Sequence, residues 1–273
     1  MSGKDFDRSN PSPTPAAKPG SSLLARHPWL TYLLPFIVYG IVGAFEPQPP
    51  KVVGDTPQTT VEVENWFGLR YEHYAIVYTA KISLTIASML FVLPGYRQFP
   101  FRVSPLAIAV GVVGVVLWIA LCQWRFEHKL LAPLGLGWLV DPGERPAFNP
   151  LEVLAATPLW AYIFLGIRFV GLTLVVPVME EFFLRGFLMR FVQQDRWWEI
   201  PFGTVTRTAV ILGTAVPMLT HPRSELLAVV VWFSLVTWLM TRTRNIWDCV
   251  AAHAVTNFLL GVYVVTQHQW QLW

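Results

Sequence analysis

The stretch Val175-Val-Pro-Val-Met-Glu-Glu-Phe-Phe-Leu-Arg-Gly-Phe-Leu-Met-Arg190 places two adjacent carboxylates, Glu180 and Glu181, inside an apolar run. An ionisable group at the depth of a bilayer costs several kcal/mol unless it is paired, so it indicates a functional site. Two later apolar runs each supply a histidine, His221 and His253. The pattern predicts a chemically active polar site built by apolar helices.

Composition indicates a membrane protein. Hydrophobic residues make up 54% of the 273 residues and charged residues only 14%, about half of the charged fraction usual in soluble domains. Apolar runs of roughly 20 residues recur, the length needed to span about 30 Å of hydrocarbon. The sequence therefore predicts an all-α fold, a polytopic transmembrane bundle of about seven or eight helices. The net charge of +3 is not gathered in a basic run, so nucleic acid is not an expected partner.

The order of the apolar runs divides the chain into three regions. Residues 1–27, rich in Ser, Pro and Gly, are expected to form a disordered tail. Residues 28–157 hold about three spans with their loops, and residues 158–267 hold the candidate site. Within the second region, Leu130–Val140 is too short to span and is expected to be interfacial or re-entrant. The predicted spans are Trp29–Phe45, Tyr74–Leu93, Pro105–Gln123, Pro158–Val176, Met179–Phe191, Arg207–Leu219, Ser224–Thr241 and Ile246–Gln267.

The distribution of basic residues does not fit eight complete crossings. Basic residues in the tail, and the short loop Arg97–Arg102 two spans later, favour a cytoplasmic N-terminus. Eight crossings would then place the basic segments Arg196–Arg207 and Arg242–Arg244 outside. One resolution is that Met179–Phe191, which carries both glutamates and two arginines, is not a complete crossing. The sequence alone leaves the parity open.

Spacing suggests different roles for the two glutamates. On a helix, Glu181 and Arg185 lie four residues apart on one face, where a salt bridge would neutralise both charges. Glu180 is rotated by about 100° from Glu181, so it is expected to face a cavity. Pro177 suits the first turn of a helix, whose N-terminus favours carboxylates. The alternative is that all three charged side chains form one buried ion network.

His253 and Asn257 are also four residues apart and share one face of the last apolar run. An imidazole N–H and a side-chain amide there could donate hydrogen bonds to a developing oxyanion. The alternative is a polar clamp between helices. His221 lies at the end of its apolar run, before Pro222. It is a candidate catalytic residue only because the other candidates accompany it. Arg168, one run before the glutamates, is a candidate second counter-ion or a structural residue.

These segments resemble the CAAX protease and bacteriocin-processing family of intramembrane proteases, also called the Abi or type II CAAX prenyl protease family. The motifs that carry the resemblance are Glu180-Glu181-x-x-x-Arg185-Gly186, then His221, then Arg244-Asn-Ile-Trp-Asp-Cys-Val-Ala-Ala-His253-x-x-x-Asn257. The resemblance covers about residues 158–267. The family usually has an aromatic residue four positions before the middle histidine, where this chain has Pro217. The Arg168 to Arg185 stretch is also similar to an exosortase-associated, CAAX prenyl protease-related subset.

The resemblance implies an intramembrane endopeptidase in a bacterial inner membrane. Glu180, helped by His221, would activate a water molecule. His253 and Asn257 would stabilise the tetrahedral oxyanion, and the Arg185 salt bridge would support these groups. The substrate would be a membrane-anchored protein or lipidated peptide, cut near the membrane boundary.

A metal is the alternative to a cofactor-free mechanism. Glu180, His221 and His253 could in principle supply three ligands to a catalytic zinc with an open position. No His-Glu-x-x-His spacing supports such a site, and the two cysteines form no Cys-x-x-Cys motif. The residues therefore favour a metal-independent glutamate mechanism, with zinc as the open alternative.

Two other classes of function compete with hydrolysis. A proton-coupled carrier could use intramembrane glutamate, histidine and arginine as a proton relay, although the internal repeats common in carriers are not visible. A non-catalytic membrane scaffold or immunity protein is the third possibility. In every case the lipid bilayer is an expected partner.

Overall fold

The computed structural model describes residues 23–49, 51–52, 60–61, 67–140 and 147–273. Within these residues the fold is all-α apart from the short antiparallel pair β1 (Lys51–Val52) and β2 (Thr60–Val61). The expected disordered tail falls outside them up to residue 22. The α-helices are α1 Leu23–Arg26, α2 Leu30–Gly43, α3 Tyr74–Phe91, α4 Leu93–Tyr96, α5 Pro105–Trp124, α6 Phe126–Leu131, α7 Pro150–Val153, α8 Pro158–Val170, α9 Val176–Glu181, α10 Met189–Phe191, α11 Arg207–Met218, α12 Leu226–Thr243 and α13 Ile246–Gln267.

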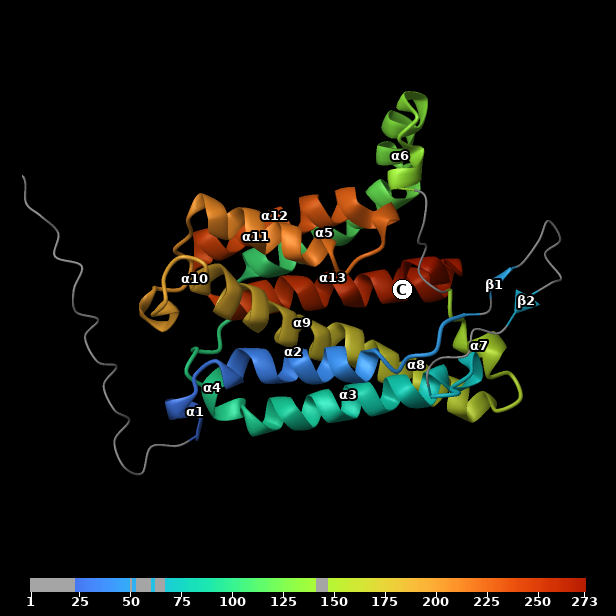
Figure 1. Ribbon diagram of the computed structural model, residues 1–273, viewed down its shortest axis with the longest axis horizontal. Coiled ribbons are helices and arrows are strands. Elements are labelled where there is room, and N and C mark those ends of the chain that lie inside the picture. The colour runs from blue at the N-terminus through green and yellow to red at the C-terminus, as the bar shows by residue number, and fades with distance from the viewer. Residues whose placement is uncertain (1–22, 50, 53–59, 62–66, 141–146) are drawn as a thin grey trace, which may run out of the picture.

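The long helices lie side by side and form a polytopic bundle (Figure 1). In the described part of the chain, five helical stretches are long and apolar enough to cross a membrane. The expected spans at Trp29–Phe45 and Arg207–Leu219 appear as the shorter helices α2 and α11. The five long stretches are Tyr71–Phe91, Pro105–Leu134, Pro158–Phe191, Arg223–Thr243 and Ile246–Gln267.

The two spans expected around Pro177 form one continuous helix, Pro158–Phe191. Two π-helical segments, Gly171–Val175 and Phe182–Leu188, lie within it and flank α9. A π-turn changes the backbone hydrogen-bond ladder locally, and the first of these turns ends two residues before Pro177, which has no backbone N–H to donate. The expectation of two separate spans was therefore wrong, and one candidate span is present where two were predicted.

Small residues let the central helices approach closely. A Cβ atom added to Gly111 of α5 would lie 2.7 Å from the Ala252 carbonyl of α13, and one added to Gly114 would lie 2.8 Å from Trp232 of α12. Such close approaches at glycine are how helices gain packing energy in lipid, where burial of apolar surface contributes little. They fix α12 and α13, which carry part of the candidate site, against α5.

The first half of the chain packs on the helix that carries the glutamates. A Cβ atom at Gly186 would lie 2.7 Å from the ring of Tyr32 in α2, and one at Gly171 would lie 2.6 Å from the hydroxyl of Tyr78 in α3. Tyr32 and Phe182 also share a buried apolar cluster. The α2–α3 hairpin is thereby held beside the site.

Side-chain caps fix where the site helices begin. Ser104, Thr206 and Asn245 each accept a hydrogen bond from a backbone N–H in the first turn of α5, α11 and α13, respectively. Such caps satisfy donors that a helix start leaves unpaired. Asp248 in turn accepts from the backbone N–H of Ser104 at 2.8 Å and from its hydroxyl at 3.0 Å, which ties α13 to the start of α5.

The segment after α5 leaves the bundle. α6 and the short 3₁₀ turns Ala132–Leu134 and Gly137–Leu139 project sideways (Figure 1) and contain no buried residue. Leu134 and Trp138 are among its exposed apolar side chains. An interfacial location for this segment remains a prediction.

Candidate functional site

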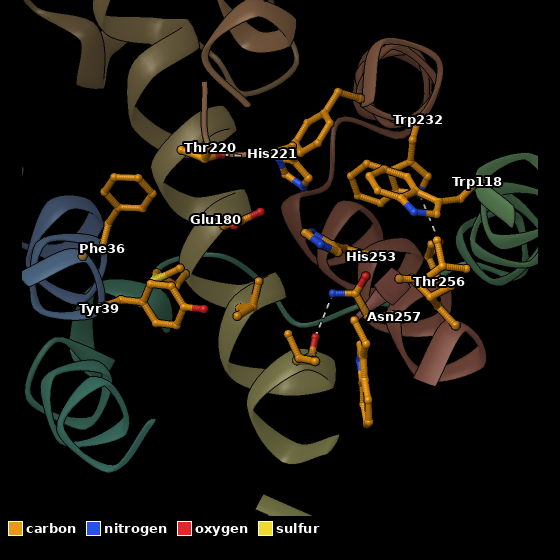
Figure 2. A pocket seen from close by; sticks show the side chains of 18 residues that line it. Phe36, Tyr39, Trp118, Glu180, Thr220, His221, Trp232, His253, Thr256 and Asn257 are labelled. Carbon is orange, nitrogen blue, oxygen red and sulfur yellow. Dashed lines mark hydrogen bonds between the residues drawn. The ribbon is translucent and has the colours of Figure 1, made fainter. Parts of the chain in front are cut away.

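The four residues predicted to be catalytic line a single cavity of about 300 Å³. Glu180 comes from α9, His221 from the turn after α11, and His253 and Asn257 from α13. Figure 2 shows the four side chains pointing into the space between these elements. Residues that are far apart in the sequence thus converge, which is the spatial condition for a joint chemical role. Their catalytic roles remain a prediction.

The rest of the cavity wall is largely apolar and aromatic. Phe36 stacks on Phe183, with ring centroids 3.9 Å apart, and so brings α2 to the wall. A small, apolar cavity with a few convergent polar groups is typical of ligand-binding and active sites. The other lining residues are Tyr39, Gly40, Trp118, Leu172, Val176, Met179, Thr220, Trp232, Phe233, Thr256, Leu260, Leu272 and Trp273.

Glu181 points away from the cavity into the protein. Its side chain is fully buried and its Oε2 lies 2.5 Å from Nη1 of Arg185, whose side chain is also fully buried. The predicted salt bridge is therefore present. Arg185 also donates to the Phe233 carbonyl at 3.3 Å and lies over the ring of Phe233. Because a buried charge without a partner is costly, each of these two side chains depends on the other to remain buried in the helix that presents Glu180.

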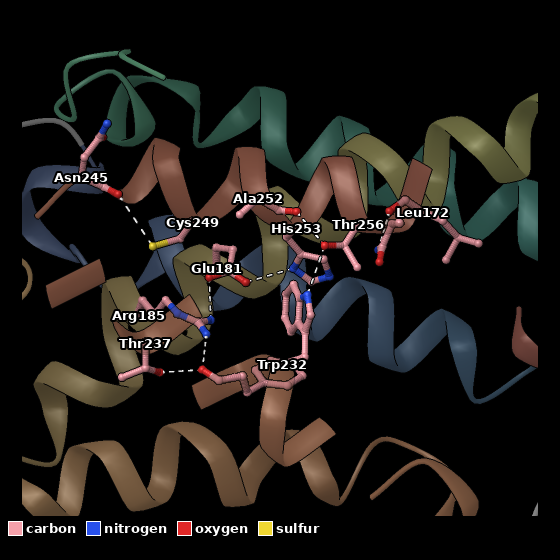
Figure 3. Close-up of polar contacts among 12 residues, drawn as sticks. Leu172, Glu181, Arg185, Trp232, Thr237, Asn245, Cys249, Ala252, His253 and Thr256 are labelled. Atoms are coloured by element: carbon pink, nitrogen blue, oxygen red, sulfur yellow. Dashed lines mark hydrogen bonds and ion pairs between the residues drawn. The ribbon is translucent and has the colours of Figure 1, made fainter. Parts of the chain in front are cut away.

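Glu181 also contacts His253, which spacing in the sequence could not reveal. Its Oε1 lies 2.9 Å from Nδ1 of His253, across 72 residues of sequence (Figure 3). A carboxylate paired with Arg185 can only accept a hydrogen bond, so Nδ1 of the imidazole is the donor. This leaves Nε2 of His253 as the ring nitrogen available to the cavity. The second carboxyl oxygen of Glu181 thus orients a predicted catalytic group.

The ring of His253 is also held by aromatic packing. Trp232 of α12 lies edge-on to it, with ring centroids 4.5 Å apart. The indole N–H of Trp232 donates to the Thr256 hydroxyl at 3.1 Å, and this hydroxyl is 2.9 Å from the Gly111 carbonyl. Nothing in the sequence pattern singled out Trp232 or Thr256, because their relation to His253 depends on how α12 and α5 pack.

His221 is held by the end of its own helix. Its Nδ1 lies 2.8 Å from the carbonyl oxygen of Pro217, four residues earlier. A carbonyl only accepts hydrogen bonds, so Nδ1 is the donor in this contact. The rings of Trp118 and Phe233 lie edge-on to the imidazole at 5.7 and 5.8 Å. The proline at position 217 therefore does not displace the histidine, since its carbonyl fixes the ring.

Asn257 contacts the π-helical turn that precedes Pro177. Its side-chain amide donates to the Leu172 carbonyl at 2.8 Å. One amide hydrogen is used in this bond, which leaves the second hydrogen for a ligand. The side chain therefore links α13 to the glutamate-bearing helix, as a clamp would, and also lines the cavity.

Arg168 is buried beside the cavity and not on its wall. It donates to the Phe148 carbonyl at 3.3 Å, and its guanidinium lies 5.0 Å from the ring centre of Trp273, which does line the cavity. The guanidinium also lies near the rings of Tyr74 and Tyr78. With these contacts, Arg168 acts as a structural residue behind the cavity wall. Its role as a counter-ion to the glutamates stays a prediction.

The arrangement of donors does not suit a metal. Among the described residues, no group of three or more His, Cys, Asp or Glu side chains is placed to hold a metal ion. Glu180, His221 and His253 share the cavity wall, but they do not form a three-ligand set. These residues therefore do not fit a three-ligand zinc site.

Comparison with known proteins identifies one family. Residues 159–259 match the family described as type II CAAX prenyl endopeptidase Rce1-like, a family of proteases. The match includes Glu180, His221, His253 and Asn257 and leaves the first half of the chain outside. No curated protein and no solved structure matches the chain. The resemblance predicted from the sequence motifs is confirmed at the level of the family.

Proposed function

Starting from the match of residues 159–259 to the Rce1-like type II CAAX prenyl endopeptidase family, we propose that this protein is an intramembrane endopeptidase that works without a metal. The observation that carries the proposal is the convergence of a carboxylate, two imidazoles and a carboxamide on one cavity within an apolar bundle. Hydrolysis of a peptide bond needs an activated water and stabilisation of an oxyanion, and this set of groups can supply both.

Glu180 is the proposed general base. Its carboxylate faces the cavity, while the neighbouring Glu181 is neutralised by Arg185. Since Nδ1 of His221 donates to the Pro217 carbonyl, Nε2 is the ring nitrogen that would accept a hydrogen bond from the same water. The proton taken from the water would pass through Glu180 to the leaving amine. Positioned acid–base groups of this kind contribute about 10²- to 10⁴-fold to a rate.

His253 and Asn257 are the proposed oxyanion donors. Since the Nδ1 hydrogen of His253 goes to Glu181, the ring can donate into the cavity only when Nε2 also carries a hydrogen. The proposed role therefore requires the form of His253 in which both ring nitrogens carry a hydrogen. Asn257 adds the amide hydrogen that Leu172 does not take. Each such donor is worth about 2.7–4 kcal/mol of transition-state stabilisation.

The proposed substrate is a membrane-anchored protein or lipidated peptide, cut near the boundary of a bacterial inner membrane. A cavity of about 300 Å³ has room for a short stretch of peptide. The apolar wall favours apolar side chains next to the scissile bond. A lipid anchor would remain in the bilayer beside the bundle.

Peptide cleavage by the purified protein tests this function. Wild type, Glu180→Ala and the matched control Glu152→Ala, an exposed carboxylate outside the cavity, are compared in detergent on a peptide library read by mass spectrometry. We expect cleavage by wild type and control, none by Glu180→Ala, and no loss after treatment with a chelator. Equal cleavage by Glu180→Ala would remove the base from the mechanism, and loss with chelator that zinc restores would favour a metal. No cleavage by wild type of any peptide would favour a carrier or a scaffold.

A further inference from the structure

Arginines gather at one end of the bundle, the end that carries α1, α4 and α10 in Figure 1. Contacts between segments that are far apart in the sequence show that these parts of the chain lie together at this end. The Trp247 indole donates to the Phe99 carbonyl at 3.0 Å, and the rings of Tyr32 and Trp197 lie 5.1 Å apart. We call it the basic end. Its described arginines, apart from the buried Arg190, are Arg26, Arg97, Arg102, Arg196, Arg207, Arg242 and Arg244.

The opposite end, which carries α7 and the end of α13 in Figure 1, has a different balance of charge. Among the described residues, fewer Lys and Arg side chains lie at this end, and two of them are paired with carboxylates, Arg70 with Glu72 and Lys81 with Glu46. The basic end has the pair Arg196–Glu199, but most of its described arginines are in no such pair. The continuous helix Pro158–Phe191 stands in place of two of the expected spans. As a result, the connections after α4, α10 and α12 all lie at the basic end. The segments Arg196–Arg207 and Arg242–Arg244 are therefore on the same side as the loop Arg97–Arg102, and not on the opposite side as eight crossings would require.

The cavity is closed toward the basic end. His253, on its floor, lies seven residues after Ile246 in α13, about 10 Å from the basic end at a rise of about 1.5 Å per residue. Between this floor and the basic end lie the fully buried pair of Glu181 and Arg185 and the buried ring of Phe182, which packs in one cluster with Ile246. Side chains therefore fill the path from the cavity to the basic end.

The cavity wall continues toward the opposite end. Gly40 lies three residues before the end of α2, and Leu260 lies about 21 Å along α13 from its start. Trp273 follows the end of α13, and the exposed Thr220 forms part of the rim. These lining residues place the mouth of the cavity in the half of the bundle remote from the basic end.

A polar hollow at this same end adjoins the cavity. It has a volume of about 330 Å³, and Leu272 lines both spaces. Only the side chain of Leu272 would separate water in this hollow from the cavity that holds the candidate site. The hollow is lined by Cys122, Gln123, Arg125, Ser224, Glu225, Gln269, Gln271 and Leu272.

We propose that the candidate site opens to the extracytoplasmic side of the membrane, and that its substrate carries the scissile bond on that side. Lys and Arg in short connections favour the cytoplasmic side of a membrane, which makes the basic end cytoplasmic and the mouth of the cavity extracytoplasmic. The substrate class is then a membrane-anchored protein whose cut segment has already crossed the bilayer. The statement about cleavage rests on the proposed function, whereas the statement about the mouth does not.

Cysteine labelling in intact bacterial cells tests the orientation without any assay of activity. Cys122 and Cys249 are replaced by Ser and Ala, and single cysteines are placed by Gln267→Cys at the end of α13 and by Arg97→Cys at the basic end, both exposed positions. A membrane-impermeant maleimide should label Gln267→Cys in intact cells. Arg97→Cys should react only after permeabilisation. The reverse pattern would overturn the proposal.

Cleavage of two designed substrates tests the second part. The sequence selected by the peptide library is fused to a single-span anchor on either its extracytoplasmic or its cytoplasmic flank, and both fusions are expressed with wild type or Glu180→Ala. We expect wild type to cut the extracytoplasmic version alone. Cleavage of only the cytoplasmic version would overturn the proposed side while keeping the peptidase. If neither fusion is cut while cysteine labelling gives the expected pattern, the proposed peptidase activity would be excluded and the proposed orientation would stand.

Discussion

At the scale of single residues, two neighbouring glutamates do different things because one helical step separates their directions by about 100°. Glu181 is buried against Arg185 and His253, whereas Glu180 faces the cavity. The salt bridge between Glu181 and Arg185 could be predicted from the sequence, because residues four apart on a helix lie on the same face. The bond to His253 could not, since only the packing of α13 on α9 creates it.

Removal of the charge of Glu181 should destabilise the protein and impair catalysis. Glu181→Gln leaves Arg185 buried without a counter-ion, which costs about 3–5 kcal/mol for such pairs, and weakens the hold on His253. Thermal unfolding in detergent should show a clear drop in the melting temperature. The control Glu199→Gln breaks an ion pair with Arg196 in which both side chains are more than half exposed and should change stability by about 0–1 kcal/mol. Equal melting temperatures for the two variants would contradict the account of this ion pair.

Loss of the Asn257 amide should reduce the rate more than it affects binding of substrate. We expect Asn257→Ala to lower kcat by about 10²- to 10³-fold with little change in KM, as for other oxyanion donors. Kinetics on the selected peptide measure this, and Gln267→Ala, an exposed position at the end of the same helix, is the control. A rise in KM at unchanged kcat would indicate that Asn257 serves only in binding or in packing on Leu172.

At the scale of elements, the residues that decide the architecture are a proline and a few glycines. The sequence predicted two spans separated near Pro177, which suits the first turn of a helix, but Pro158–Phe191 is continuous through the π-helical segment Gly171–Val175. Such a turn has no clear signature in one sequence, so the number of crossings could not be predicted there. The close approach at Gly186 was likewise visible only once Tyr32 of α2 was placed beside it.

Two glycines on this one helix should respond oppositely to the same substitution. Gly186→Ala puts a Cβ 2.7 Å from the buried ring of Tyr32 and should destabilise the protein by about 1–3 kcal/mol, as overpacking does. Gly166→Ala meets nothing within 4 Å and should leave stability unchanged or raise it by up to about 1 kcal/mol, because alanine favours helix. Melting temperatures of both variants give the comparison. A more stable Gly186→Ala would show that α2 does not pack closely there.

At the scale of the whole molecule, composition and run length sufficed to predict an all-α membrane bundle. The sequence motifs predicted the family, which the match over residues 159–259 confirms. The contribution of the first half of the chain to the cavity was not predictable, because Phe36 and Tyr39 of α2 carry no motif and reach the wall only through tertiary packing.

The first half of the chain should therefore influence substrate binding. Phe36→Ala removes a ring from the cavity wall, and we expect KM to rise by about ten-fold, equivalent to about 1.4 kcal/mol, with a smaller effect on kcat. The control Ile37→Ala alters a neighbouring side chain that is 44% exposed on the outside of the bundle and should leave KM unchanged. Peptide kinetics in proteoliposomes compare the two, and equal KM values would exclude Phe36 from the substrate site.

The most direct test of the central claim, that separate helices build one catalytic unit, is a double-mutant comparison of cleavage rates. Glu180→Gln, His253→Gln and the double variant are measured on one peptide. Groups that act together are not additive, so the double variant should be no slower than the slower single variant. A double variant whose loss equals the product of the two single losses would contradict a shared site.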